Sequence, residues 1–439
     1  MNIAVVALGK IGLPLAVQFA CKGNVVIGCD INDRTVTAVN RGIEPFPGEE
    51  LLAEKLSEVV NSGLLKATTD TSAAVRQADV VVIVVPLVVD EDGIPNFDAI
   101  DSATRDVGLG LKKNTLVAFE TTLPVGTTRI RFAKMLEKES GLRPGVDFSL
   151  VFSPERVFSG RVFSDLRRYP KIIGGFSESC ANAGKEFYES VLDFDERADL
   201  ERPNGVWNLG SCEAAEFVKL AETTYRDVNI GLANQFARFA DKSGIDLFKV
   251  IEACNSQPFS HIHKPGIAVG GHCIPVYSQF YVWNDPTAQI VRDARLLNER
   301  MPEYGVQLLE AEHGSLEGQR VAVLGATYRG GVKDTSFSGV FPVVTALKEK
   351  KAIVFVHDPL LTDAELMSIG FQPYVYGKNL DAAIIQSDHA EYENLTAEKL
   401  GNARTLLNGR NMSLPRLSIK VVTLGNTRVG KTSSSRIFK

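Results

Sequence analysis

Residues 1–17 read MNIAVVALGKIGLPLAV, and the order of apolar residues and glycines in them indicates the class of fold. The apolar run over residues 2–8 predicts a short buried strand. Gly9 and Gly12 then mark a tight turn, and the pattern from Leu13 to Cys21 predicts a helix. A strand, a glycine turn and a helix in this order are typical of the start of an α/β fold with a parallel sheet.

The same alternation continues through the first half of the chain. Apolar runs bounded by turn residues predict further strands at Asn24–Cys29, Val80–Pro86, Thr115–Phe119 and Ser149–Phe152. Helical or loop segments separate these runs. We therefore expect a parallel, doubly wound sheet, which is a Rossmann-like arrangement.

The residue pattern changes from alternating strands and helices to long helical segments beyond about residue 205. Between Cys212 and Ser243 the chain has no proline and a single glycine, and its apolar residues recur at helical spacing. A helix of this length predicts a connector between domains. Further helix is expected at Ile245–Cys254 and Ala288–Gly314.

A second α/β pattern follows this helical region, with a helix expected at Gly339–Glu349. Its strands are expected at Gln319–Gly325, Ala352–Val356, Leu380–Ile385 and Ala403–Leu407. The sequence thus predicts an α/β domain over 1–205, a helical connector and dimerisation domain over 206–316, and a smaller α/β domain over 317–439.

The first turn also predicts a nucleotide site. In dinucleotide-binding folds a G-x-G-x-x-G turn lets a pyrophosphate approach the helix N-terminus. Here Ala7 takes the place of the first glycine, and Asp30 closes the second strand 21 residues after Gly9. A carboxylate at that place accepts hydrogen bonds from a ribose and repels a 2′-phosphate, which favours NAD over NADP. The alternative is that Asp30 only caps the following turn.

Composition excludes several function classes. The 439 residues contain 48 Lys and Arg against 53 Asp and Glu, so the net charge of -5 argues against a nucleic-acid or membrane-surface role. The N-terminus lacks a basic segment before its apolar run, so neither a signal peptide nor a membrane span is expected. The six cysteines lack C-x-x-C spacing, which predicts free thiols in a cytoplasmic protein and no metal site.

One motif match near the C-terminus suggests a different nucleotide site, a P-loop. Residues 425–432 read GNTRVGKT and fit the P-loop pattern. A P-loop needs a helix after its threonine, and only SSSRIFK follows here. We therefore interpret the segment as a basic tail.

The chemistry points to two other segments. Residues 270–275 read GGHCIP and place Cys273 beside glycines that leave the backbone bare, which predicts a thiol within reach of a substrate. The alternative is a buried structural cysteine. On the long helix, Lys219, Thr223 and Arg226 share one face at helical spacing, which fits either an anionic substrate or a solvated stripe.

Together these segments resemble the nucleotide-sugar 6-dehydrogenases, the family of UDP-glucose and UDP-N-acetylhexosamine dehydrogenases. The resemblance covers nearly the whole chain in order. It includes the N-terminal turn, ETTLPVG at 120–126, SPER at 153–156, the Lys219 helix, GGHCIP and the strand that ends at Gly325. The histidine before the cysteine is similar to the N-acetylhexosamine branch.

The resemblance implies an NAD-dependent four-electron oxidation of a UDP-sugar C6 alcohol to a carboxylate in a homo-oligomeric enzyme. Cys273 would attack the aldehyde to give a thiohemiacetal, which is oxidised to a thioester and hydrolysed. Lys219 would stabilise oxyanions at C6, Thr122 would hold a water, and Glu155 would move protons. The cofactor would be held by Gly9, Ile11, Gly12, Asp30, Arg34 and Thr122, and the substrate by Glu155, Arg156, Lys219, Thr223, Arg226, Asn229, Gly270 and His272. The C-terminal domain would bind the UDP group.

The chain departs from the family pattern at several positions. Thr223 stands where an Asn is usual, Ser159 and Tyr277 stand where the UDP-glucose branch has Glu and Asp, and an Arg expected within residues 330–336 is absent. Three alternatives therefore remain. They are a UDP-glucose dehydrogenase, a non-catalytic nucleotide-sugar-binding relative, and a two-electron 3-hydroxyacid dehydrogenase, which would not use Cys273.

Overall fold

A computed structural model describes residues 1–90 and 92–427 of the chain. These residues form two compact units. The first comprises Met1–Glu222 and Gln279–Asp285, and the second comprises Thr223–Ser278 and the described residues from Pro286 onward. No helix in the described part is long and apolar enough to cross a membrane.

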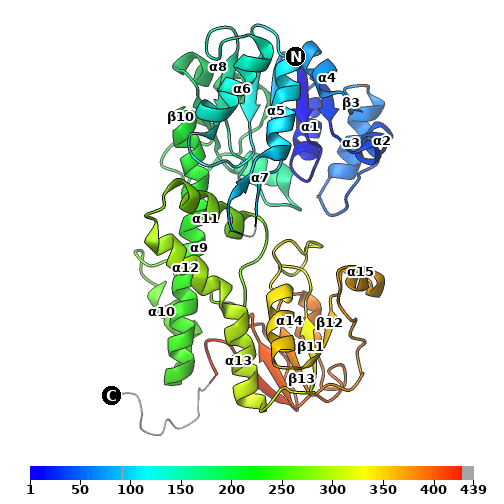
Figure 1. The fold of residues 1–439 in the computed structure, drawn as a ribbon, viewed down its shortest axis with the longest axis vertical. Coiled ribbons are helices and arrows are strands. Elements are labelled where there is room, and N and C mark those ends of the chain that lie inside the picture. The colour runs from blue at the N-terminus through cyan, green and yellow to red at the C-terminus, as the bar shows by residue number, and fades with distance from the viewer. Residues whose placement is uncertain (91, 428–439) are drawn as a thin grey trace. The chain divides into compact units, whose positions relative to one another are not determined.

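The first unit is built on an eight-stranded sheet of order β10-β9-β8-β7-β4-β1-β2-β3 (Figure 1). Every neighbouring pair is parallel except β8 and β9, which are antiparallel. The strands are β1 (Asn2–Val6), β2 (Val25–Cys29), β3 (Leu65–Thr68), β4 (Val80–Ile83), β7 (Leu116–Phe119), β8 (Ser149–Phe152), β9 (Lys171–Gly175) and β10 (Val206–Ser211). A small hairpin pairs β5 (Val88–Val89) with β6 (Pro95–Asn96).

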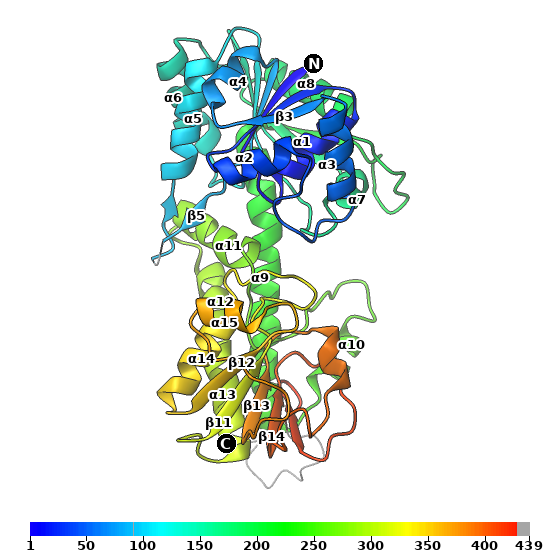
Figure 2. The ribbon, with the colours of Figure 1, turned by 90° about the vertical axis from the view of Figure 1, so that its right-hand side faces the viewer.

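Helices cover both faces of this sheet. They are α1 (Gly12–Cys21), α2 (Asp33–Asn40), α3 (Leu52–Asn61), α4 (Thr71–Gln77), α5 (Asp98–Gly110), α6 (Ala133–Ser140), α7 (Val162–Arg168) and α8 (Glu178–Val191). A π-helical turn, Thr128–Phe132, leads into α6. In Figure 2, α5 and α6 lie on one side of the sheet and α1 and α3 on the other. One core joins α1, α3 and α8 to the sheet, and in it Phe19 and Phe187 meet edge to face.

The long helix predicted from the sequence is α9 (Cys212–Ser243), and its bounds are those expected. It contributes residues to both units, as does α11 (Cys273–Asn284). The expected helix over 288–314 is two helices, α12 (Gln289–Glu299) and α13 (Met301–His313), which meet at Arg300. Pro302 stands in the first turn of α13, where its missing N–H costs nothing.

The second unit holds α10 (Leu247–Cys254), α12, α13 and a five-stranded parallel sheet of order β12-β11-β13-β14-β15. Its strands are β11 (Arg320–Leu324), β12 (Ile353–His357), β13 (Ala382–Ile385), β14 (Thr405–Asn408) and β15 (Lys420–Thr423). Two helices, α14 (Val340–Glu349) and α15 (Asp363–Ser368), and the 3₁₀ turn Ala390–Asn394 connect them. Cores lie on both faces of this sheet.

The predicted α/β class is confirmed, with a Rossmann-like N-terminal sheet, a central helical region and a smaller C-terminal α/β domain. The fully parallel order expected for the first sheet is wrong at one place, because β9 runs against β8. The three domain boundaries predicted from the sequence stay a prediction.

Candidate functional site

The turn after β1 forms the predicted nucleotide site of the first unit. Ala7 has φ 78°, the left-handed conformation that a glycine adopts without cost. A Cβ on Gly12 would lie 1.9 Å from the Ala7 carbonyl oxygen, so only glycine fits there. A Cβ on Gly9 would meet nothing within 4 Å, which leaves its backbone open to a ligand.

The carboxylate of Asp30 organises this turn. It accepts hydrogen bonds from the N–H of Leu8 at 2.9 Å and from the N–H of Asn32 at 2.9 Å, and its side chain is half-buried. Arg34 is exposed in the first turn of α2, where Asn32 caps its N–H at 3.0 Å. Asp30 does cap the turn, as the alternative interpretation expected, but capping does not use all of its hydrogen-bonding capacity. Because each of its oxygens can accept a second hydrogen bond, a ribose can still bind there.

These residues fit NAD. The N-terminus of α1 begins at Gly12 with Ile11 as its cap, and no side chain satisfies its first N–H groups. A helix end of this kind binds a phosphate, and the bare Gly9 lets the phosphate approach. Asp30 stands at the carboxyl end of β2, where a ribose hydroxyl is expected.

Four further predicted residues belong to the first unit. Thr122, Glu155 and Lys219 are 5%, 9% and 9% exposed. Glu155 forms an ion pair with the buried Lys171. Arg156 pairs with Glu222 of α9 and donates to the Pro170 carbonyl at 3.2 Å, so part of its guanidinium is already bound within the chain.

The cysteine segment belongs to the second unit. Cys273 is exposed and is the first residue of α11, the end of a helix that favours negative charge. The neighbouring His272 ring lies edge-on to Tyr277 and Phe337. Its Nε2 is buried with no hydrogen-bond partner among the described residues, and burial lowers the pKa of His272.

The two glycines before Cys273 do not leave the backbone open, as the sequence suggested. A Cβ on Gly270 would lie 2.8 Å from the Phe337 carbonyl oxygen and 2.8 Å from Tyr328 Cβ. A Cβ on Gly271, which has φ 82°, would lie 3.0 Å from the Tyr328 ring. The glycines therefore admit a loop of the chain itself, residues 326–338, against the cysteine segment.

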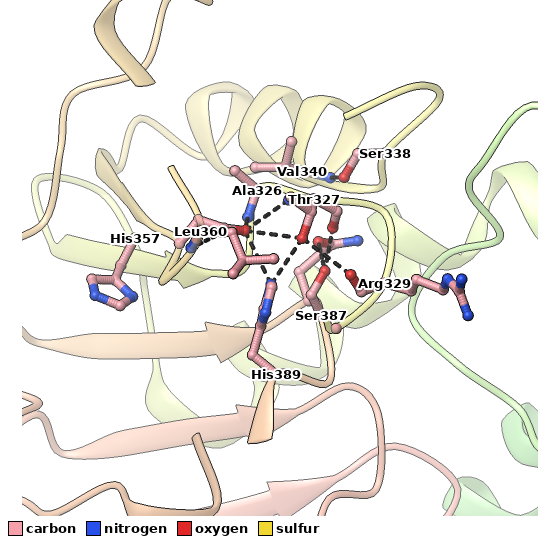
Figure 3. Close-up of polar contacts among 12 residues, drawn as sticks. Ala326, Thr327, Arg329, Ser338, Val340, His357, Leu360, Ser387 and His389 are labelled. Atoms are coloured by element: carbon pink, nitrogen blue, oxygen red, sulfur yellow. Dashed lines mark hydrogen bonds and ion pairs between the residues drawn. The ribbon is translucent and has the colours of Figure 1, made fainter. Parts of the chain in front are cut away.

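A buried polar cluster anchors that loop at the carboxyl ends of β11 and β12. Asp358 accepts from the N–H of Ala326 at 2.7 Å and of Thr327 at 2.9 Å, and His389 Nε2 lies 3.1 Å from the same carboxylate. Figure 3 shows His389 pointing toward Thr327, whose hydroxyl lies 2.8 Å from its Nε2. The loop that covers the two glycines is thus fixed at its start.

The remaining substrate candidates lie on the part of α9 in the second unit. Thr223 is buried and Arg226 is exposed. The Asn229 amide donates to the His261 carbonyl at 2.9 Å and accepts from the His263 N–H at 3.1 Å. Asn229 therefore holds the 261–263 loop, which is a role that the sequence did not suggest.

Arg410 is a candidate that sequence reasoning missed. It follows β14 and donates to the Gln386 carbonyl at 2.6 Å and the Ala268 carbonyl at 2.9 Å, while its Nη2 is buried without a partner among the described residues. Burial lowers the pKa of Arg410. An arginine just beyond the carboxyl end of a parallel strand is a recognisable signal, since ligands bind at that edge.

The P-loop match falls partly on residues 428–432, which lie outside the described residues. Its first residues are described. The N–H groups of Gly425 and Thr427 donate to the Asp241 carboxylate at 3.0 and 3.1 Å. Two N–H groups that a phosphate would use are therefore occupied by a side chain.

Three domain models of one family match the chain. They are the NAD binding domain (residues 1–192), the central domain (213–300) and the UDP binding domain (322–414) of the UDP-glucose/GDP-mannose dehydrogenase family. A UDP-N-acetyl-D-mannosamine dehydrogenase of Pyrococcus horikoshii is 36% identical over 420 residues, covering 94% of this chain and 96% of that protein.

Solved structures agree with this match. The structure of a UDP-D-ManNAc dehydrogenase from Pyrococcus horikoshii has a TM-score of 0.86 at 33% identity, covering 98% of this chain and 100% of that one. A UDP-glucose dehydrogenase from Pyrobaculum islandicum has a TM-score of 0.84 at 27% identity, covering 96% of each. With its turn built for a dinucleotide and three matched domains, the chain belongs to the UDP-glucose/GDP-mannose dehydrogenase family and is an NAD-dependent oxidoreductase.

Proposed function

We propose that the protein oxidises the C6 alcohol of a UDP-N-acetylhexosamine to the carboxylate, with Cys273 as the covalent nucleophile. The observation that carries this proposal is an exposed thiol at the first residue of α11 within GGHCIP, in a chain of this family. Three other cysteines are poorer candidates for the nucleophile, because a buried thiol is out of reach of a substrate. Cys29, Cys180 and Cys212 are buried.

The chemistry explains the residue types. NAD, when bound, would supply the oxidant, because each NAD accepts one hydride and so serves one two-electron step. The Cys273 thiolate adds to the C6 aldehyde to form a thiohemiacetal, and after the second oxidation the C6 carbon is a thioester. Water attacks this thioester, the C–S bond breaks with its electron pair on sulfur, and the acid leaves.

Side chains of the first unit would serve these steps. Lys219 would stabilise negative charge on the C6 oxygen. Thr122 would hold the water, and Glu155 would take and return the protons. Gly9, Ile11, Gly12, Asp30 and Arg34 would hold NAD.

A second set of residues would bind the UDP-sugar. We assign to it Arg156, Thr223, Arg226, Gly270 and His272, with Asn229 acting through the loop that it holds. To these we add Arg410, because an unpartnered buried guanidinium N–H requires an acceptor such as a diphosphate oxygen.

Two observations bear on the sugar. Several of the relatives carry the name UDP-N-acetyl-D-mannosamine dehydrogenase, including the one at 36% identity, and the GGHCIP form agrees with that branch. The departures at Ala7, Thr223 and Tyr277 favour the non-catalytic binder as an alternative. Ser159 and Tyr277 replace the acids of the UDP-glucose branch and so argue against the other alternative, a UDP-glucose dehydrogenase. The left-handed turn at Ala7 weakens one argument for the binder, since alanine there keeps the glycine conformation.

We also propose a homodimer in the cytoplasm. One face of α9 in the second unit exposes four large side chains at heptad-like spacing, namely Tyr225 (57%), Leu232 (46%), Phe236 (36%) and Phe239 (60%). An apolar stripe of this kind fits the same helix of a second copy, because a two-fold interface pairs identical surfaces.

The test is NADH formation with UDP-ManNAc, UDP-GlcNAc, UDP-GalNAc and UDP-glucose. We expect two NADH per acid, no free aldehyde, and the highest kcat/KM with an N-acetylated sugar. Cys273→Ala should lower acid formation by several orders of magnitude while NAD still binds. Cys254→Ala, a half-buried thiol on α10, is the matched control and should keep most activity. Near-normal acid formation by Cys273→Ala would remove the covalent mechanism, and preference for UDP-glucose would remove the branch assignment.

A further inference from the structure

A buried lysine lies between two carboxylates in the first unit. Glu120 follows the last residue of β7, Glu155 lies three residues beyond β8, and Lys171 is the first residue of β9. Because β9 runs antiparallel to β8, with Val151 opposite Gly175 and Phe152 opposite Gly174, its first residue returns to the edge where Glu155 lies. The one antiparallel pair in the sheet thus places Lys171 beside Glu155.

The contacts of this cluster are short and direct. Lys171 Nζ donates to Glu120 Oε2 at 2.7 Å and also to Glu155 Oε1. The second oxygen of Glu120 accepts from the Tyr188 hydroxyl at 2.7 Å. The side chains of Glu120, Lys171 and Glu155 are 0%, 5% and 9% exposed, so water screens none of these charges well.

The charges in the cluster do not balance if every group is ionised. Two carboxylates face one ammonium, and two neighbouring carboxylates of this kind retain a proton between them. Burial, followed by the charge of Glu155, raises the pKa of Glu120 to about 8 against the opposing effect of Lys171. Burial lowers the pKa of Lys171, but Glu120 and Glu155 more than offset this and the pKa is raised, so the lysine stays a cation.

The two carboxylates are not equivalent. Glu120 is sealed beneath Tyr188 of α8, and burial with the nearby Glu120 charge raises the pKa of Tyr188 well above its usual value. Glu155 lines a cavity of about 10 Å³, close to the smallest that admits a water molecule. Lys171, Arg156, Asp165 and Tyr169 also line it, Arg156 being paired with Glu222 and Asp165 with Arg161. Glu120 is therefore the sealed carboxyl that keeps the proton, and Glu155 is the member of the pair that lies at the cavity.

We propose that Glu120 and Glu155, bridged by Lys171, act as one carboxylate pair that shares a single proton, and that this pair handles the proton in the hydrolysis of the thioester. Glu120 and Lys171 are positioning residues that act through Glu155. The proposal rests on the role given to Glu155 in the proposed function.

The proton balance in the hydrolysis step is simple. The attacking water loses one proton to Glu155, so the pair passes from one proton to two. The C–S bond then breaks with its electron pair on sulfur, the pair gives up its second proton, and the Cys273 thiolate takes up one proton. At the end, the thiol and the pair with its single proton are restored, and the acid has gained the water oxygen.

The test follows the titration of the pair in the unliganded full-length protein, by infrared absorption of the protonated carboxyl C=O group. In Glu120→Gln a single carboxylate faces the lysine, so the upper titration step of the wild type should disappear. In Lys171→Met the cation is lost, so that step should move to higher pH. Lys171→Arg keeps the charge and should restore a step near that of the wild type.

Asp101→Asn is the control. It breaks a more exposed ion pair of the same unit, that of Asp101 with Arg131 at 2.8 and 2.5 Å, and should leave the titration unchanged. The pH profile of kcat for acid formation should show the same pattern. Its fall at basic pH should disappear in Glu120→Gln and should move to higher pH in Lys171→Met. If Lys171→Met does not fold, the Glu120→Gln and Lys171→Arg measurements carry the test.

An upper step that persists in Glu120→Gln would overturn the shared proton. Titrations that shift as expected, with pH profiles that do not follow them, would overturn the role of the pair in the reaction. Since the infrared titration needs no substrate, it stands or falls separately from the proposed function, which fails if no UDP-sugar yields NADH.

Discussion

The chain builds the same turn twice, once in each α/β sheet, and only one copy remains open. After β1, the N–H of Ala7 donates to the Cys29 carbonyl at 2.8 Å. After β11, the N–H of Gly325 donates to the His357 carbonyl at 2.7 Å. In each case the next N–H binds the aspartate that ends the second strand, Asp30 at 2.9 Å or Asp358 at 2.7 Å.

The two copies differ in what surrounds the aspartate. Asp30 is half-buried and accepts two backbone hydrogen bonds, whereas Asp358 is 4% exposed and is also held by Thr327 and His389. In the first unit α1 starts five residues after Ala7, but in the second unit α14 starts only at Val340. The intervening loop, residues 326–338, packs on Gly270 and Gly271 through Tyr328 and Phe337. A strand, a turn and an acid therefore specify a backbone geometry, and accessibility decides whether that geometry binds a ligand.

The largest loss of stability is expected from adding a methyl group at Gly325, in the turn after β11. A Cβ on Gly325 would lie 2.3 Å from Ser387 Cβ, and the residue has φ 100°. Gly325→Ala should therefore destabilise the protein by about 3 kcal/mol or more. Denaturant unfolding of the second unit measures this, with Gly318→Ala as a control at φ 72° without a steric neighbour. Equal losses in the two variants would show that the clash contributes nothing.

Asp358 should govern acid sensitivity. Burial would raise its pKa, but hydrogen bonds from His389 and the Thr327 N–H outweigh burial and lower it to about 2. Because the folded-state pKa is lowered, about 2 kcal/mol of stability is present above pH 4 and is lost as the pH falls from about 4 toward 2. Asp358→Asn should lose this stability at neutral pH and unfold with a flatter acid dependence. A variant whose acid unfolding matches that of the wild type would contradict the assignment.

Asp30 should affect the cofactor rather than the fold. Asp30→Asn removes the charge but leaves an oxygen for the Leu8 N–H, so stability should change little. The KM for NAD should rise about tenfold, and the preference for NAD over NADP should shrink, because the repulsion of a 2′-phosphate is lost. Steady-state kinetics with both cofactors provides the measurement, and Asp358→Asn, with an unchanged KM for NAD, is the matched control. Equal use of both cofactors by the wild type would remove Asp30 from this role.

The smallest effect is expected at Ala7. Glycine adopts the left-handed conformation at no steric cost but gains freedom in the unfolded chain, so Ala7→Gly should stabilise the first unit by about 0.5 kcal/mol. Ala38→Gly in α2 should instead destabilise it by about 1 kcal/mol. Thermal unfolding of the two variants distinguishes them, and a destabilised Ala7→Gly would mean that the methyl group makes a contact worth more than the strain.

Local signals predicted well where one segment determines its own structure. The proline-free stretch of apolar periodicity gave α9 with its observed ends, and the glycines after β1 marked the first turn. The sequence did not predict the reversal of β9, because strand direction depends on pairing with β8 and not on the residues of β9 alone.

The site shows the same limit. Gly270 and Gly271 suggested an open backbone, yet Tyr328, nearly sixty residues away, packs on them. Lys171 was not singled out, because a lysine at the start of a strand is ordinary until Glu120 and Glu155 are seen beside it. Such residues become recognisable only through contacts between distant segments.

The exposure of Cys273 has a practical consequence for covalent labelling. Burial raises the pKa of Cys29 to about 12 and that of Cys212 still further, so these thiols rarely form the reactive anion near neutral pH. Cys21, which is also exposed, has a pKa raised by partial burial of its sulfur. A mild haloacetamide probe should thus mark the helix-terminal Cys273 first. Its protection by a bound nucleotide sugar would turn the alkylation rate into a binding assay that needs no turnover.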